Sequence, residues 1–537
     1  MSGAEQTTGP DQMTGPTPDN ALRNADRANT GPVLAADGTP LKKSLAKALR
    51  REKTRALLLI APLLVFILVT FIAPIADMLF RSVENGIVAE TIPRTVNELR
   101  EWDSDAEELP PESVFEAFYT DMVFAEERKL HTRLGSRLNY EMTGVSSLFR
   151  KTGRGVGRFD TDEYTDAFVD LNEAWEDPVT WADLMREGGR LPNTRSAYDT
   201  WALTVTEDGD DPLEEEPWDV LFFNLYTDLT AAEGETFASP LLTEAQGAVA
   251  SMEPISIRAQ FEDVDEDWLD PQVWKTIQTY SAKYTPGYFL NSVDLQLTPD
   301  GVEAREELQQ IYIKLFVRTL IMSLVITGSC ILLGYPVAWL LANLPARHAN
   351  LLMILVLLPF WTSLLVRTSA WKVLLQQQGV INDTLVWIGL VGDGNRLELI
   401  NNQTGTIIAM THILLPFMIL PLYSVMKTIP PSYLRAAKSL GATNWTAFWR
   451  VYFPQSVPGI GAGSILVFIL AIGYYITPEL VGGTQGVFIS NRIAYHISSS
   501  LNWGLGAALG TILLVAVLIL YWAYDKVVGI DNVKLGG

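Results

Sequence analysis

Long apolar stretches constrain this chain more than any other feature of its sequence. The first runs from Ala56 to about Ala76, and five more follow at about residues 313–344, 350–375, 404–428, 457–477 and 505–524. An α-helix rises about 1.5 Å per residue, so each stretch is long enough to cross the roughly 30 Å hydrocarbon layer of a bilayer. The sequence therefore predicts an all-α polytopic membrane protein with six transmembrane helices.

The charges that flank these stretches predict their orientation. Residues 427–456 contain cations but no acid, whereas residues 376–403 and 478–504 carry Asp383, Asp393, Glu398 and Glu479. Cytoplasmic loops of membrane proteins are enriched in Lys and Arg, so both chain ends are predicted to be cytoplasmic. A cationic cluster immediately before the first stretch agrees with this orientation: Lys42, Lys43, Lys47, Arg50, Arg51, Lys53 and Arg55.

These features divide the chain into segments. Residues 1–40, rich in Gly, Pro and Thr, are predicted to form a disordered cytoplasmic tail. A basic juxtamembrane segment follows at 41–55, then the first transmembrane helix at 56–80 and an extracytoplasmic segment at 81–311. The remaining membrane helices occupy 312–525, with a cytoplasmic loop at 428–456. Residues 526–537 are predicted to form a cytoplasmic C-terminal tail.

The segment of residues 81–311 differs from the rest in charge and aromatic content. Residues 81–310 hold 18 Lys and Arg against 49 Asp and Glu, a net charge of −31, while the remainder holds 22 against 13. Near-helical apolar spacing from Ser113 to Leu130 follows a Pro pair. We expect a large, mostly helical insertion, with a partly ordered extension as the alternative. Seven tryptophans are available to fill a core: Trp102, Trp175, Trp181, Trp201, Trp218, Trp268 and Trp274.

Motifs for energy conversion are absent from the sequence. It contains neither GxxxxGK[ST] nor HExxH, and Cys330 is the single cysteine. We therefore expect no catalytic residue, no metal site and no cofactor. The net charge of −22 argues against a nucleic-acid partner, because phosphate binding needs a cationic surface.

The cytoplasmic loop between the fourth and fifth stretches has the pattern of two short helices separated by Gly441. Ser432 is placed to cap the first helix, and the second is expected to begin at about Asn444. Pro454 and Pro458 are then expected to redirect the chain into the membrane. The apolar side chains of this elbow suit a groove in a partner protein: Leu434, Ala437, Leu440, Trp445, Phe448 and Trp449.

This loop resembles the EAA loop of bacterial ABC importer permeases, the membrane subunits of binding-protein-dependent, MetI-like importers. Arg435 stands where that family usually has Glu, so a salt bridge made by the Glu is not available here. Five stretches are similar to the spermidine/putrescine branch: residues 359–371, 378–382, 412–430, 474–483 and 502–514. The matching elbow positions are Ala436, Ala437, Gly441, Ala442, Phe448, Val451, Pro454, Pro458 and Gly459.

The resemblance implies a channel-forming permease subunit of an ATP-driven polyamine importer in the lipid of the bacterial inner membrane. It implies two copies of a separate ATPase bound through residues 432–449, a second permease subunit and an extracytoplasmic solute-binding protein. Family members have a much shorter first outer loop, so the acidic segment is a departure. The preferred hypothesis is that the acidic segment docks the binding protein. The alternatives are that it attracts cationic solutes, or that it is a lineage-specific addition with neither role.

Two alternatives in function stay open. In the first alternative, the chain is an importer permease for another small organic solute, such as an amino-acid-like compound or an opine. The second is a membrane receptor or scaffold with an acidic ectodomain, which lacks a signalling domain after Asp525.

Four residues near the predicted outer ends of the spans are candidates for the translocation pathway: Trp361, Arg367, Tyr475 and Glu479. A carboxylate beside aromatic faces complements an ammonium group. Tyr and Trp also gather at membrane interfaces, which is the alternative for these positions. Within the spans, His412 is expected to form a hydrogen bond inside the bundle. The glycine pairs Gly459/Gly463 and Gly506/Gly510 are expected to let helices approach closely.

Overall fold

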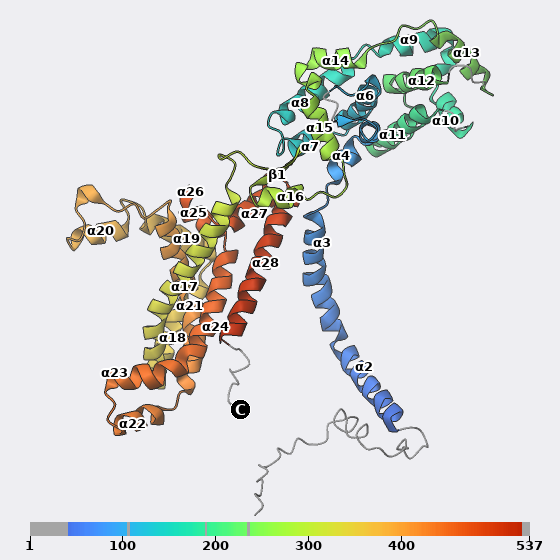
Figure 1. The fold of residues 1–537 in the computed structure, drawn as a ribbon. Helices are drawn as coiled ribbons and strands as arrows, with labels where there is room; N and C mark the ends of the chain where they lie inside the picture. The colour runs from blue at the N-terminus through green and yellow to red at the C-terminus, as the bar shows by residue number, and fades with distance from the viewer. Residues whose placement is uncertain (1–40, 105–107, 188–190, 233–236, 529–537) are drawn as a thin grey trace, which may run out of the picture. The chain divides into compact units, whose positions relative to one another are not determined.

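The computed structural model describes residues 41–104, 108–187, 191–232 and 237–528, which form helices and one antiparallel hairpin (Figure 1). The predicted N-terminal tail and most of the C-terminal tail lie outside these residues. By its contacts the chain divides into two units, Met1–Met78 and Leu79–Gly537. Each unit is described separately.

The first unit is a long helical run. α2 (Leu41–Ile67) passes through a π-helical turn, η1 (Leu68–Ile72), into α3 (Ala73–Arg81). Its most apolar window has a mean hydropathy of 3.0, and none of that window is buried among the described residues. The basic segment at 41–55 therefore belongs to the same helical run as the first predicted span.

Residues 82–311 form what we call the acidic domain. It consists of short helices and the hairpin β1–β2, in which Leu295 pairs with Ala304. Its elements are α4 (Gly86–Thr91), α5 (Pro93–Leu99), α6 (Glu112–Glu127), α7 (His131–Leu138), α8 (Val145–Gly155), η3 (Val156–Arg158), α9 (Asp162–Leu171), η4 (Glu173–Trp175), α10 (Pro178–Glu187), α11 (Pro192–Asp208), α12 (Asp219–Ala231), α13 (Pro240–Val249), α14 (Ile257–Val264), η5 (Glu266–Leu269), α15 (Pro271–Thr279), α16 (Gly287–Ser292), β1 (Leu295–Thr298) and β2 (Gly301–Ala304).

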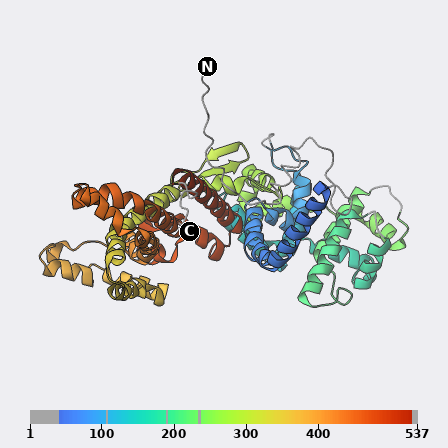
Figure 2. The same ribbon diagram turned by 90° about the horizontal axis from the view of Figure 1, so that it is seen from below.

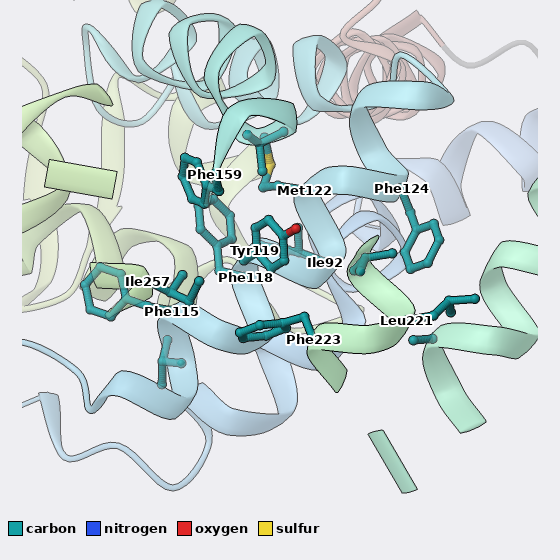
Figure 3. Packing of buried hydrophobic residues seen from close by; sticks show 14 of the residues in the cluster. Ile92, Phe115, Phe118, Tyr119, Met122, Phe124, Phe159, Leu221, Phe223 and Ile257 are labelled. Carbon is teal, nitrogen blue, oxygen red and sulfur yellow. The ribbon is translucent and has the colours of Figure 1, made fainter. Parts of the chain in front are cut away.

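Aromatic side chains fill the core of the acidic domain. The ring of Phe118, on α6, lies 4.7 Å from that of Trp268 and 5.2 Å from that of Trp274. Figure 3 shows Phe118 among other buried side chains, including Phe115 and Tyr119 from the same helix. The predicted helical character of this segment is confirmed, and α6 lies within three residues of the predicted helix at each end. Five of the seven tryptophans are fully buried: Trp175, Trp181, Trp201, Trp268 and Trp274.

Residues 312–528 form a helix bundle. Its elements are α17 (Tyr312–Asn343), α18 (Ala346–Leu357), η6 (Leu358–Trp361), α19 (Leu364–Leu374), α20 (Val380–Trp387), η7 (Asp393–Asn395), α21 (Gln403–Thr428), α22 (Pro431–Ser439), α23 (Asn444–Ala447), η8 (Phe448–Tyr452), α24 (Phe453–Gly473), α25 (Ile476–Val481), α26 (Gly483–Gly486), α27 (Ile489–Ser498) and α28 (Trp503–Val528). Helices α17, α21 and α24 pack together, whereas the segment around α20 lies beside them in both views (Figures 1 and 2).

Small residues bring α24 against α21. A Cβ added at Gly459 would lie 3.0 Å from Val425 Cβ, and one added at Gly463 would lie 2.6 Å from Met418 Sδ. Helices without side chains at the contact approach closely, which strengthens dispersion packing where lipid offers no hydrophobic gain. The close approach expected at the first glycine pair is therefore confirmed.

The third predicted span, residues 350–375, is wrong as a single helix. α18 with η6 and then α19 are bent by 95° at a short break. Pro359 lies in η6, and Thr362 and Ser363 have ψ near 145°, which interrupts the α-helical hydrogen bonds. The described residues thus contain five helices long and apolar enough to cross a membrane, or six if the bent pair is one span.

The acidic domain and the bundle share polar contacts at the start of α17. The carboxylate of Asp294 accepts hydrogen bonds from the backbone N–H groups of Ile311, Tyr312 and Ile313 at 2.8–3.0 Å. An acid at a helix N-terminus satisfies unpaired donors and complements the helix dipole. Within the bundle, the hydroxyl of Tyr312 lies 2.9 Å from His496 Nε2, and burial lowers the pKa of His496 to about 4.

Candidate functional site: an elbow and a cluster at opposite ends of the bundle

The elbow consists of α22, Gly441, α23 and η8. α22 ends at Ser439, and Gly441 adopts φ +89°, in the left-handed region that favours glycine. α23 then starts at Asn444, where the Thr443 side chain accepts a hydrogen bond from the Thr446 N–H. The predicted helix–glycine–helix shape of this loop is present. Figure 1 shows the elbow at the end of the bundle remote from α25 and α26.

Two details of the predicted elbow are wrong. The helix is not capped by Ser432, because it already begins at Pro431, with Pro430 at the N-cap position. Proline is accommodated in the first turn since its missing N–H would have no partner there. Pro454 and Pro458 do not interrupt the helix or redirect the chain either. Residues Asn444–Gly473 form one helical run, and its π-helical turn, Phe448–Tyr452, comes before Pro454.

Phe448 attaches the elbow to the bundle. Its ring lies 6.1 Å from that of Tyr335, on α17, and 5.9 Å from that of Tyr452. The Tyr335 hydroxyl lies 2.9 Å from Ser456 Oγ, on α24. Displacement of the elbow would therefore be transmitted to both α17 and α24.

Several side chains of the elbow face away from the bundle. Leu440 is 89% exposed and Trp445 is 71% exposed. Leu434 and Ala437 are half-buried, so Leu440 does not share their side of α22 as the spacing predicts; it lies just past the end of the helix. The family-like positions Arg435, Ala436 and Pro454 are also exposed, whereas Ala442 is half-buried. Exposed apolar groups flanked by small and cationic residues form a surface suited to docking.

The pathway candidates lie toward the other end of the bundle, and the structure brings only some of them together. Asn491 donates to the Glu479 carboxylate at 2.6 Å and to the Tyr475 carbonyl at 2.9 Å, so these two candidates share a partner. Glu479 belongs to the short helix α25, not to the end of the fifth span, because α24 stops at Gly473. Trp361 is 75% exposed and, among the described residues, has no aromatic pair with Tyr475.

Arg367 lies on α19, the second half of the broken span. Its Nε is buried without a hydrogen-bond partner among the described residues. The indole N–H of Trp371 donates to His412 Nδ1 at 3.1 Å, which confirms the hydrogen bond expected inside the bundle. The Thr368 and Thr477 hydroxyls, 3.2 Å apart, join α19 to α25. α19, which carries Arg367, therefore packs against α25.

Asp294, His496 and Tyr312 were not singled out from the sequence. Asp294 is one acid among many and precedes the first residue of the helix it caps by 18 residues, so it carries no local capping signal. Its φ of +59° is unusual for a residue other than glycine and is visible only in the structure.

The structure thus combines a bundle of apolar helices with an exposed elbow at one end. Residues 311–528 match the family model of the binding-protein-dependent transport system inner membrane component. The spermidine/putrescine transport system permease protein PotB of Salmonella typhimurium is 36% identical over 222 residues, which are 41% of this chain and 77% of that protein. The chain therefore belongs to this family of ABC importer permeases, in its spermidine/putrescine branch.

Two further similarities describe the extent of the match. The inner membrane ABC transporter permease protein YdcU of Escherichia coli is 34% identical over 271 residues, 48% of this chain and 82% of that protein. The crystal structure of a bacterial alginate ABC transporter in complex with an alginate pentasaccharide-bound periplasmic protein covers 40% of this chain at 20% identity, with a TM-score of 0.34. The family model begins at residue 311, so it does not include the helices of the acidic domain.

Proposed function

We propose that this chain is the channel-forming permease subunit of an ATP-driven importer for polyamines or similar organic cations. The elbow carries the proposal. It presents Leu440 and Trp445 to solvent, and it is attached through Phe448 to α17 and to the helical run that continues into α24. A motor protein that binds this surface and moves it would rock these helices, which is how access alternates in transporters built from rigid helical units.

The proposal assigns the partners and the orientation. Two copies of a separate ATPase bind the elbows of this chain and of a second permease subunit, on the cytoplasmic side. The acidic domain then lies outside the cell membrane, inserted between the first and second spans. There it docks the solute-binding protein, because screening over about 8 Å in physiological salt limits any long-range attraction of free solute.

Co-purification tests the coupling. We expect Leu440→Ser combined with Trp445→Ser to lose the ATPase from the purified complex, because an exposed apolar anchor dominates an interface of this kind. Trp387→Ser is the matched control: Trp387 is 84% exposed, on α20, and lies outside the elbow. Full retention of the ATPase by the elbow variant would refute the coupling role.

Solute identity is tested on the cognate binding protein and on uptake. We expect spermidine or putrescine to compete with uptake and an amino acid or opine not to compete. The reverse pattern would support a permease for another solute and contradict the polyamine assignment.

Docking of the binding protein is tested with Glu214→Gln and Glu216→Gln, two exposed acids of the acidic domain, in the assembled transporter. A loss of binding-protein affinity is expected, and unchanged affinity together with no dependence on salt would reject electrostatic docking.

A further inference from the structure

A cavity of about 530 Å³ lies between the acidic domain and the start of α28. Its wall is formed by residues of α4 and α7, by Tyr288 of α16 and by residues 500–504. This volume is in the range of small-ligand sites, about 300 to 1,000 Å³. Gly504 allows Tyr288 to close one side, because a Cβ at Gly504 would lie 2.4 Å from the Tyr288 ring.

Cationic groups form one side of the cavity. Arg133 and Arg137 both line the cavity. Arg133 is exposed, whereas Arg137 is only 4% exposed. Arg137 Nε donates to Tyr288 and Asn85, and Nη1 donates to Glu141 at 2.7 Å. Its buried Nη2 has no hydrogen-bond partner among the described residues. The unused donor leaves the positive charge of this buried guanidinium only partly compensated.

The charge balance around Arg137 points the same way. Glu141 is shared between Arg137 and Arg305, which lies 3.6 Å from its second oxygen, so this buried group keeps a net positive charge. The first turn of α28, Trp503 and Gly504, adds the positive end of a 26-residue helix to the same wall. An anionic group is the ligand that both features favour.

The cavity has apolar side chains on the side of α28 and charged side chains elsewhere, a combination that fits an amphiphilic ligand. Trp503 is 49% exposed and Leu501 is 66% exposed, and both line the cavity where an apolar candidate span begins. Arg81 lies over the Trp503 ring at 5.9 Å. Basic pockets between transmembrane helices bind lipid headgroups through their phosphates on the cytoplasmic side of other membrane proteins, and the same charge pairing would serve a phosphate here. Two exposed acids, Glu84 and Glu90, also line the cavity and complement a cation.

We propose that this cavity binds a zwitterionic phospholipid headgroup. Its phosphate is bound by Arg133 and attracted by the buried positive charge of Arg137, and its ammonium is bound by Glu84 and Glu90. The acyl chains leave past Trp503 and Leu501 along α28. The bound lipid would join the acidic domain to the bundle. This inference depends on α28 being a membrane span and is independent of which solute is carried.

Native mass spectrometry of the delipidated full chain tests the site, with phosphatidylethanolamine as the probe. We expect wild type to bind one molecule of the added lipid. Arg133→Gln should bind it about tenfold more weakly, since a charge-assisted hydrogen bond is lost. Arg158→Gln, an exposed arginine outside the cavity, is the matched control and should bind like wild type. Equal retention by wild type and Arg133→Gln would overturn the proposal.

Two further probes separate the sources of the phosphate. Inorganic phosphate at the same concentration should not displace the lipid, and displacement would indicate a soluble anion instead. Glu84→Gln should weaken phosphatidylethanolamine but not phosphatidylglycerol, which has no ammonium group. Stronger binding of phosphatidylglycerol than of phosphatidylethanolamine by wild type would overturn the zwitterionic assignment.

Discussion

The acidic domain and the helix bundle use different side chains for the same task of holding helices together. The domain packs short helices around large rings, as at Phe118 and Trp268. The bundle packs long helices through glycines, as at Gly463 against Met418. The difference follows from the solvent. In water, burying a large apolar side chain is itself favourable, whereas in lipid stability comes from close contact between helices.

Removing a ring from the acidic domain is expected to have the largest effect. Trp268→Ala deletes a fully buried side chain and the hydrogen bond from its indole N–H to Thr152 Oγ1. We expect a loss of about 3–5 kcal/mol in the free energy of unfolding, measured by urea titration followed by tryptophan fluorescence. Trp218→Ala, at a half-buried position against the same core, should cost less. Equal losses would contradict a ring-filled core as the source of stability.

Acid is expected to weaken the contact between the two regions. His496 is buried against Tyr312 of the bundle, its ring lies 6.3 Å from that of Tyr140 in the acidic domain, and its pKa is about 4, below the usual 6.5. Because its pKa is depressed by folding, the stabilisation is present above pH 6.5 and is lost as the pH falls toward 4. The change is at most roughly 3 kcal/mol. Thermal unfolding at several pH values should show a smaller pH dependence for His496→Gln, and an unchanged dependence would assign the effect to other groups.

Filling a glycine contact is expected to have an intermediate effect confined to the bundle. Gly463→Val would place carbon atoms against Met418 Sδ, 2.6 Å from the first added atom, and overpacking of this kind costs about 1–3 kcal/mol. Gly473→Val is the control, because nothing lies within 4 Å of its added Cβ. The readout is the melting temperature in detergent. Similar melting temperatures for both variants would show that close approach is not needed.

Surface charge pairs are expected to contribute least. Arg128 Nη2 lies 2.9 Å from Glu207 in the acidic domain, with side chains that are 33% and 49% exposed. Arg128→Ala should change the free energy of unfolding by less than about 1 kcal/mol in urea titrations. A larger loss would mean that the acidic domain depends on its surface charges more than on its core.

Local patterns predicted the helices well because local forces decide them. The spans on α17, α21 and α28, the helix α6 and the turn at Gly441 each follow from periodicity, length or one residue's φ preference. Local patterns failed where a short break redirects the chain. Pro359 was visible, yet the 95° bend goes with tertiary contacts: α19 packs against α25, and its Trp371 donates to His412 of α21.

The sequence by itself determined the apolar stretches, the helical character of the acidic segment and the helix–glycine–helix elbow, because each is encoded in neighbouring residues. Only the tertiary structure decided which polar groups meet. Tyr312 and His496 are 184 residues apart, and Arg137 and Tyr288 are 151 apart. Such partners are chosen by the packing of whole helices, and no spacing rule links them. The phosphate-binding cavity proposed at α28 belongs to this second class.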